Sequence, residues 1–267
     1  MTVQSLDMTG FTGTWTTGGF ALTSNGIMTI RGTFNAGAAT VTVNGNLNCV
    51  GATMNEGTSA FIFAATGTLA CAGTTTEFYD VTINTGVTTT FTTQQWVFNT
   101  ATINGVLLGG SPNDPQLAFL VSGTVATTPV TIGAAGDVDT SGYFIYRLRG
   151  PCGSTYTITA GRYQHLNVQA GNSACAYTAN LGGAISTPSC DVYNECSILF
   201  NSEATLTPSE NFIFNTQGFS ITAGGTLWLG DGGTTGIQFN AGSSAITAYG
   251  VSPTGSNVVV NWQTAVI

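Results

Sequence analysis

The sequence predicts an all-β protein whose short strands are wound into a parallel β-solenoid, also called a β-helix. Runs of β-branched residues alternate with threonine or asparagine and end at glycine, as in VTVNG (residues 41–45) and VTINTG (residues 81–86). That alternation is typical of a strand followed by a tight turn. Longer phrases also recur along the chain, and self-similarity every ~20–30 residues is typical of solenoid coils.

The recurring phrases lie near both ends of the chain. TFNAGAATVTVNG (residues 33–45) matches QFNAGSSAITAYG (residues 238–250). GGFALTSNGIMTI (residues 18–30) likewise matches QGFSITAGGTLWL (residues 217–229). We interpret FNAG as one corner of a coil, which recurs wherever the chain passes that corner. The alternative fold is one or more antiparallel β-sandwiches, which also show alternation but do not readily give matched phrases at many points.

The chain divides into three segments by pattern. Residues 1–110 are predicted to form solenoid coils, and residues 201–267 to form further coils and a C-terminal strand. Between them, residues 111–200 form an irregular, loop-rich insertion that opens on the two prolines of GSPNDPQLAF (residues 110–119). We expect one continuous domain. Binding functions usually reside in such loops.

Three phrases carry a resemblance to a known class of repeats. GTFNAGAATVTVNGNL (residues 32–47), FYDVTINTGVTTTF (residues 78–91) and TATINGVL (residues 100–107) resemble the Gly/Thr/Asn-rich β-helical repeats of large secreted adhesin-like proteins and of viral tail-fibre and appendage proteins. The resemblance covers the first ~110 residues and, more loosely, residues 203–250. It is a style of repeat rather than a catalytic signature, so it implies no functional residue.

The composition restricts the possible partners. Only 6% of the 267 residues are charged, there is no lysine, and the net charge is −8. Nucleic acids and polyanions are therefore disfavoured, because binding them takes clustered Lys and Arg. A surface of hydroxyls and amides with little charge repulsion favours self-association. No apolar run reaches the ~18 residues of a membrane helix, so no membrane span is expected.

These observations favour a non-enzymatic structural protein. We expect a self-assembling subunit, a homopolymer or symmetric oligomer, of a fibre or filament at an extracellular, cell or virion surface. The alternative is an adhesin or tail-fibre module that binds surface glycans. A β-helical polysaccharide lyase or hydrolase is less favoured, because the cationic groups that stabilise anionic intermediates are scarce. Ice binding is also less favoured, because the Thr-x-Thr steps are irregular.

The even number of cysteines predicts disulfides in an exported protein. Cys49 and Cys71 occupy matched positions in GNLNCVGAT (residues 45–53) and GTLACAGTT (residues 67–75), so they could bridge neighbouring coils. The other four allow three pairings: Cys152, Cys175, Cys190 and Cys196. Buried free thiols are an alternative. Zinc is disfavoured, because no Cys-x2-Cys spacing exists and there is one histidine.

The candidate binding residues lie in the middle segment. Arg147 and Arg149 share a predicted strand face in GYFIYRLRG (residues 142–150) and are flanked by Tyr143 and Tyr146. This group could stack on a sugar or form a subunit contact. With the lone histidine, these candidates are Tyr143, Tyr146, Arg147, Arg149 and His165.

Two acidic arrangements complete the candidate sites. Asp137 and Asp139 point the same way on an extended segment, so they could hold Ca²⁺ or cap a turn. No other cofactor is expected. The pairs Glu77 with Asp80, and Asp191 with Glu195, could in principle serve as glycosidase carboxylates. No pattern places either pair across a cleft, so no catalytic residue is predicted.

Overall fold

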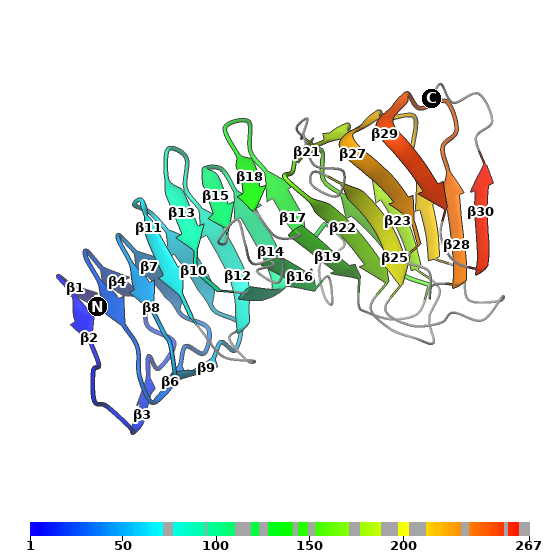
Figure 1. The fold of residues 1–267 in the computed structure, drawn as a ribbon. Coiled ribbons are helices and arrows are strands. Elements are labelled where there is room, and N and C mark those ends of the chain that lie inside the picture. The colour runs from blue at the N-terminus through cyan, green and yellow to red at the C-terminus, as the bar shows by residue number, and fades with distance from the viewer. Residues whose placement is uncertain are drawn as a thin grey trace. The chain divides into compact units, whose positions relative to one another are not determined.

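The strands stack in parallel in a computed structural model of the chain (Figure 1). The structure describes residues 1–71, 77–93, 95–109, 119–122, 128–140, 144–148, 153–170, 177–187, 197–202, 212–230, 235–253 and 256–261. Within these ranges the secondary structure is all β, without a helix. The predicted parallel β-solenoid is therefore confirmed, and the alternative antiparallel β-sandwich is wrong.

The chain forms two compact units. The first unit comprises Met1–Val121 and Thr131–Gly142, and the second comprises Ser122–Val130 and Tyr143–Ile267. The division falls inside residues 111–200, the segment that the sequence pattern sets apart. Each unit consists of parallel coils that add one strand to each of several sheets.

The first unit contains three parallel sheets. The first sheet runs in the order β1 (Thr2–Val3), β4 (Leu22–Ser24), β7 (Thr40–Val43), β10 (Ala60–Phe63), β12 (Glu77–Ile83), β14 (Gln95–Ile103) and β16 (Phe119–Ser122), and β17 (Val130–Ile132) also pairs with β14. The second runs β2 (Leu6–Asp7), β5 (Met28–Thr29), β8 (Leu47–Asn48), β11 (Gly67–Ala70), β13 (Thr88–Phe91), β15 (Val106–Gly109) and β18 (Asp137–Thr140). The third consists of β3 (Thr14–Thr16), β6 (Thr33–Asn35) and β9 (Thr53–Asn55).

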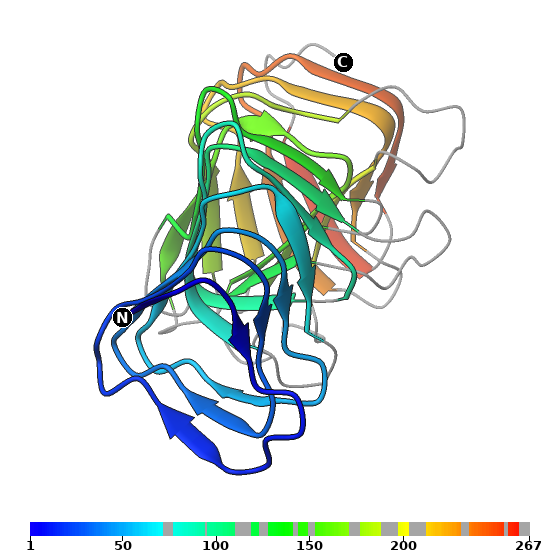
Figure 2. The same cartoon turned by 90° about the vertical axis from the view of Figure 1, so that its left-hand side faces the viewer.

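Inward-facing side chains of successive coils stack into columns. Leu22 pairs with Val41, and Val41 pairs with Phe61 of the next coil. These three side chains are at most 2% exposed. In these strands the period-two alternation thus places alternate residues in the core, which is what the sequence pattern predicts. Figure 2 shows these coils nested behind one another.

A disulfide joins two neighbouring coils of the first unit. Cys49 follows β8 and Cys71 follows β11, and these two strands pair with each other. Their Cα atoms lie 4.4 Å apart, and both residues are 0% exposed. The predicted bridge between matched positions is confirmed. Cys152, Cys175, Cys190 and Cys196 lie outside the described residues.

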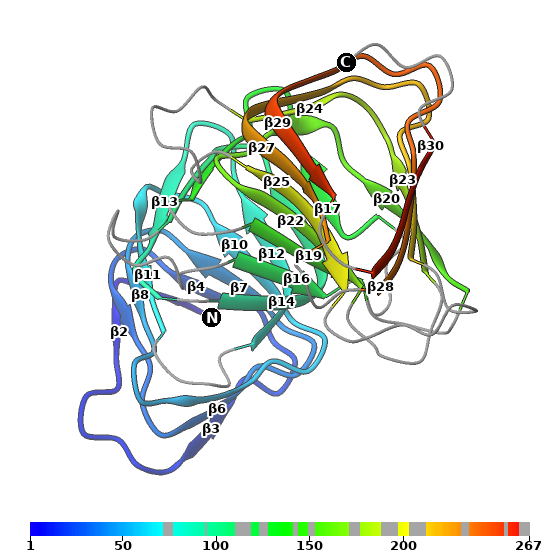
Figure 3. The ribbon, with the colours of Figure 1, turned by 45° about the vertical axis from the view of Figure 1, so that its right-hand side comes forward.

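The second unit also consists of parallel sheets (Figure 3). One runs β19 (Phe144–Leu148), β22 (Leu166–Ala170), β25 (Ile198–Ser202), β27 (Ile221–Leu229) and β29 (Ile246–Pro253). The first residues of β27 also pair with β24 (Ile185–Ser186), which pairs with β21 (Gly161–Arg162). The other sheet runs β20 (Thr155–Ile158), β23 (Tyr177–Leu181), β26 (Phe212–Asn215), β28 (Thr235–Asn240) and β30 (Ser256–Asn261).

Aromatic side chains fill the core of the second unit. The ring centroids of Phe200 and Phe214 lie 4.0 Å apart, and those of Phe214 and Phe239 lie 5.4 Å apart. All three residues are 0% exposed. Aromatic pairs of this kind stabilise a core beyond the effect of the apolar area that they bury. Through these rings, the sheet that contains β25 packs against the sheet that contains β26 and β28.

The two FNAG phrases form the same corner of a coil. Phe34 and Phe239 are 0% exposed, and Gly37 and Gly242 have φ angles of 61° and 58°. These left-handed angles favour glycine, which has no Cβ. The interpretation of FNAG as a recurring corner therefore holds in both units.

Candidate functional site

The binding residues predicted from the sequence lie partly outside the described structure. Tyr143 and Arg149 fall outside it, and Tyr146 and Arg147 belong to β19 without described side chains. His165 is 7% exposed, and its Nδ1 accepts a hydrogen bond from the Ser197 backbone N–H at 3.4 Å. The histidine thus belongs to the interior of the second unit.

The predicted calcium residues lie on β18. Asp137 and Asp139 pair in register with Val106 and Leu108 of β15, and Val138 between them is buried. Asp137 is partly exposed. Within the described ranges, no group of three or more His, Cys, Asp or Glu side chains is arranged to hold a metal ion.

The carboxylates considered as a glycosidase pair have different surroundings. Asp80 accepts hydrogen bonds from Asn99 Nδ2 at 2.9 Å and from the Thr100 backbone N–H at 3.0 Å. Burial raises the pKa of Glu77 above its usual value, and the negative charge of Glu56 raises that pKa further. Asp191 and Glu195 lie outside the described residues.

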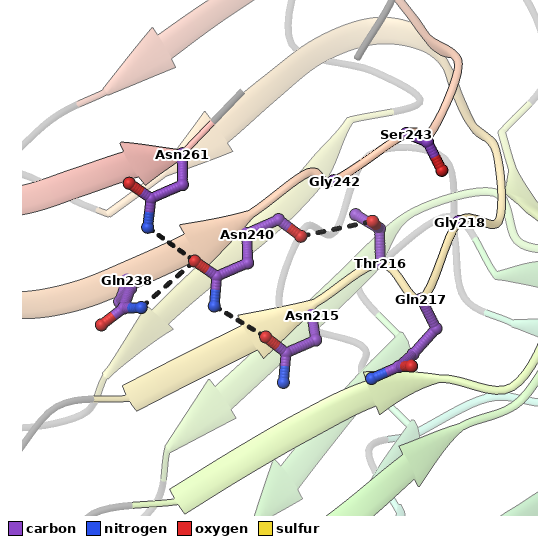
Figure 4. A pocket seen from close by; sticks show the side chains of 9 residues that line it. All are labelled: Asn215, Thr216, Gln217, Gly218, Gln238, Asn240, Gly242, Ser243 and Asn261. Carbon is purple, nitrogen blue, oxygen red and sulfur yellow. Dashed lines mark hydrogen bonds between the residues drawn. The ribbon is translucent and has the colours of Figure 1, made fainter. Parts of the chain in front are cut away.

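A polar hollow of about 720 Å³ lies on the second unit and is here called the amide-lined hollow (Figure 4). It lies at the ends of β26, β28 and β30. Amide, hydroxyl and glycine residues line it, and none of them carries a charge: Asn215, Thr216, Gln217, Gly218, Gln238, Asn240, Gly242, Ser243 and Asn261. Its size falls within the usual range of small-molecule sites.

Four asparagine carboxamides form a hydrogen-bonded ladder along this hollow. Asn261 Nδ2 donates to Asn240 Oδ1 at 2.7 Å, and Asn240 Nδ2 donates to Asn215 Oδ1 at 2.7 Å. Asn215 Nδ2 in turn donates to Asn180 Oδ1 at 2.9 Å. Because these residues are in register on adjacent parallel strands, each amide holds the next in one orientation.

Two glutamines extend the ladder sideways. Gln238 Nε2 donates to Asn240 Oδ1 at 3.1 Å, and Gln217 Nε2 donates to Asn180 Oδ1 at 3.2 Å. The hollow therefore presents a fixed array of amide donors and acceptors. Sequence reasoning missed this site, although the asparagine shared by FNAG and FIFNT (residues 212–216) was its signal.

A second candidate site lies on the first coil, residues 1–20, which exposes apolar side chains. Phe20 is 77% exposed and Met1 is 65% exposed. Two shallow hollows of about 270 and 320 Å³ lie here, and Trp15 lines both. Figure 2 looks onto this coil, shown in dark blue. Apolar side chains in such a group commonly mark a contact surface.

Comparison of the chain with protein-family models, curated proteins and solved structures finds no match. The described part of the chain also lacks any helix with the length and apolarity needed to cross a membrane.

Proposed function

We propose that this chain is a non-enzymatic structural protein that assembles with copies of itself into a fibre or filament at an extracellular, cell or virion surface. The first coil carries the proposal, because its exposed apolar side chains continue inward-facing columns of the first unit. Thr2 pairs with Thr23, so Met1, one residue earlier, lies next to Leu22. Met1 therefore continues the column formed by Leu22 and Val41. Leu22 is 2% exposed, whereas Met1 is 65% exposed.

Two other columns continue in the same way. Leu6 pairs with Met28, and Trp15 pairs with Phe34, whose ring centroid lies 5.1 Å from that of Trp15. Met28 and Phe34 are 0% exposed, whereas Leu6 and Trp15 remain partly exposed. Another parallel coil placed on the first coil would continue each column and bury these side chains.

Backbone groups support the same arrangement. Among the described strands, β1, β2 and β3 each pair on one side, with β4, β5 and β6 respectively. An open strand edge presents N–H and C=O groups to a further strand. Burying one large apolar side chain such as Phe20 contributes about 1.5–3 kcal/mol, and the low charge of the chain adds little repulsion.

We propose that the first coil binds the β29–β30 end of a second copy of the chain. Among the described residues, β29 and β30 each pair with a neighbouring strand on one side, β27 and β28 respectively. They expose Tyr249 (76%) and Val259 (51%). A contact between two different surfaces of identical chains is heterologous and can repeat without closing. Such a contact produces a filament.

Sedimentation velocity across a concentration series tests this proposal. We expect the native chain to sediment as oligomers that grow with concentration. Phe20→Asp should shift the distribution toward monomer, because it puts a charge into the contact. Val50→Asp is the matched control, since Val50 is 40% exposed but lies in a coil that has a neighbour on each side.

A monomer at every concentration would contradict the proposal, and so would equal effects of the two aspartate substitutions.

The proposal that the chain is not an enzyme is tested separately. Neutral and acidic polysaccharides incubated with the chain should be recovered uncleaved, and turnover that disappears in Glu77→Ala would overturn it.

A further inference from the structure

The corners of the coils at Thr17 and Thr216 share the same hydrogen bonds, so residues that differ between them are not needed to form the corner. Thr17 Oγ1 donates to the Ala36 carbonyl at 2.7 Å, and Thr216 Oγ1 donates to the Ala241 carbonyl at the same distance. The next turn is also shared, because Phe20 and Phe219 each return a backbone hydrogen bond to their respective threonine. Residues 16–20 therefore correspond to residues 215–219.

Three residues of the first corner are replaced by amides in the second. Gly18 corresponds to Gln217, Thr16 to Asn215, and Thr33 to Gln238. The first corner shows that the fold forms without these amides. All three amides line the hollow on the second unit.

Gln217 also adopts a backbone conformation that disfavours its side chain. Its φ is 56°, and it is the one non-glycine residue with positive φ in the described part of the chain. Gly18 at the matching position has φ 66°. Glycine adopts this region without a Cβ clash, so a glutamine here reduces local stability. Its carboxamide in turn reaches Asn180 and extends the ladder.

The ladder leaves hydrogen-bonding capacity facing the hollow. Each carboxamide has two N–H donors and an oxygen that accepts two bonds. Asn215 and Asn240 each donate one N–H to the ladder, which leaves the second N–H of each. The Gln217 and Gln238 oxygens accept no bond within the described structure. Donor capacity thus remains on Asn215 and Asn240, and acceptor capacity remains on Gln217 and Gln238.

We propose that the amide-lined hollow binds an uncharged, hydroxyl-rich saccharide. A sugar hydroxyl both donates and accepts, which matches a surface that offers amide N–H groups together with amide oxygens. Because none of the lining residues is charged, the hollow offers no ion pair to a phosphate, a carboxylate or an ammonium group. Prior ordering by the ladder also reduces the entropy lost on binding. The site differs from the Arg147 and Arg149 patch that the sequence predicted.

Isothermal titration with three uncharged hexasaccharides, built of glucose, mannose and N-acetylglucosamine, tests the proposal. At least one should bind saturably with a dissociation constant below about 1 mM. The double variant Gln217→Gly and Gln238→Thr installs the residues of the first corner. It should weaken binding about 10- to 30-fold, which corresponds to the loss of two hydrogen bonds.

Stability measurements separate binding from folding. The double variant should unfold at the same denaturant concentration as the native chain or higher, because Gly at residue 217 relieves the positive φ. Asn44→Thr is the control: it removes the Asn44–Asn25 amide pair of the first unit and should leave saccharide affinity unchanged. Binding should also be constant between about pH 5 and pH 9, since none of the lining side chains titrates there.

Three results would overturn the proposal. They are the absence of binding by all three hexasaccharides, unchanged affinity in the double variant, and tighter binding of an acidic oligogalacturonate than of any neutral probe. None of these outcomes bears on sedimentation of the native chain, so the saccharide site and the assembly proposal fail independently.

Discussion

Removing the Cys49–Cys71 disulfide should destabilise the first unit by an amount that the chain separation determines. The bond links residues separated by 22 positions. In the loop-entropy treatment, closing such a loop removes about 11 cal/mol/K from the unfolded chain, or about 3.4 kcal/mol at 25 °C. The double variant Cys49→Ala and Cys71→Ala should lose this stabilisation. It also loses the packing of two sulfur atoms that are fully buried.

Denaturant unfolding with and without reductant separates the two contributions. Without reductant, the difference in unfolding free energy between native chain and variant contains both loop entropy and sulfur packing. With reductant the native bond opens, so the remaining difference reports packing alone. The other cysteines are the same in both proteins and cancel. We predict that the two differences are separated by about 3.4 kcal/mol, and a separation below about 1 kcal/mol would refute the loop-closure argument.

Two further substitutions test local features. A Cβ on Gly57, which has φ 57°, would lie 2.5 Å from the Gly37 carbonyl oxygen, whereas a Cβ on Gly51, with φ 77°, meets no atom within 4 Å. Gly57→Ala should therefore cost about 1–3 kcal/mol more than Gly51→Ala in denaturant unfolding, and equal costs would contradict the close approach of coils. The raised pKa of Glu77 means that its contribution to stability is present at low pH and lost as pH rises through the folded-state pKa. Glu77→Gln should thus stabilise the chain at about pH 7 and have little effect at about pH 3, and a pH-independent difference would contradict the assigned burial and repulsion by Glu56.

The repeat fold could be predicted because its signals are local. Alternation along residues 41–45 places Val41 and Val43 in the core, where both are 0% exposed. FNAG predicts a corner because its asparagine ends a strand and its glycine takes positive φ. The matched positions of Cys49 and Cys71 predict their bridge, since equivalent residues of neighbouring coils lie about one strand spacing apart.

The amide-lined hollow could not be predicted in the same way. Asn180 and Gln217 are 37 residues apart, well beyond the ~20–30 residues of an ordinary coil, so no fixed repeat aligns them. The asparagines and glycines of the lining also point to no site by themselves, because Asn and Gly are common at turns in any fold. The pairing of strands β23 and β26 is what brings Asn180 beside Asn215. The site can therefore be recognised only when the register of these strands is known.

Fibre diffraction from aligned filaments of the native chain tests end-to-end assembly most directly. If coils of one copy continue onto those of the next, the strand spacing runs along the filament. The account therefore predicts a meridional reflection at about 4.7–4.9 Å. Phe20→Asp should remove both the filaments and the reflection, and Val50→Asp should retain both. A native chain that forms no filament, or filaments whose 4.7–4.9 Å reflection lies on the equator, would contradict end-to-end stacking.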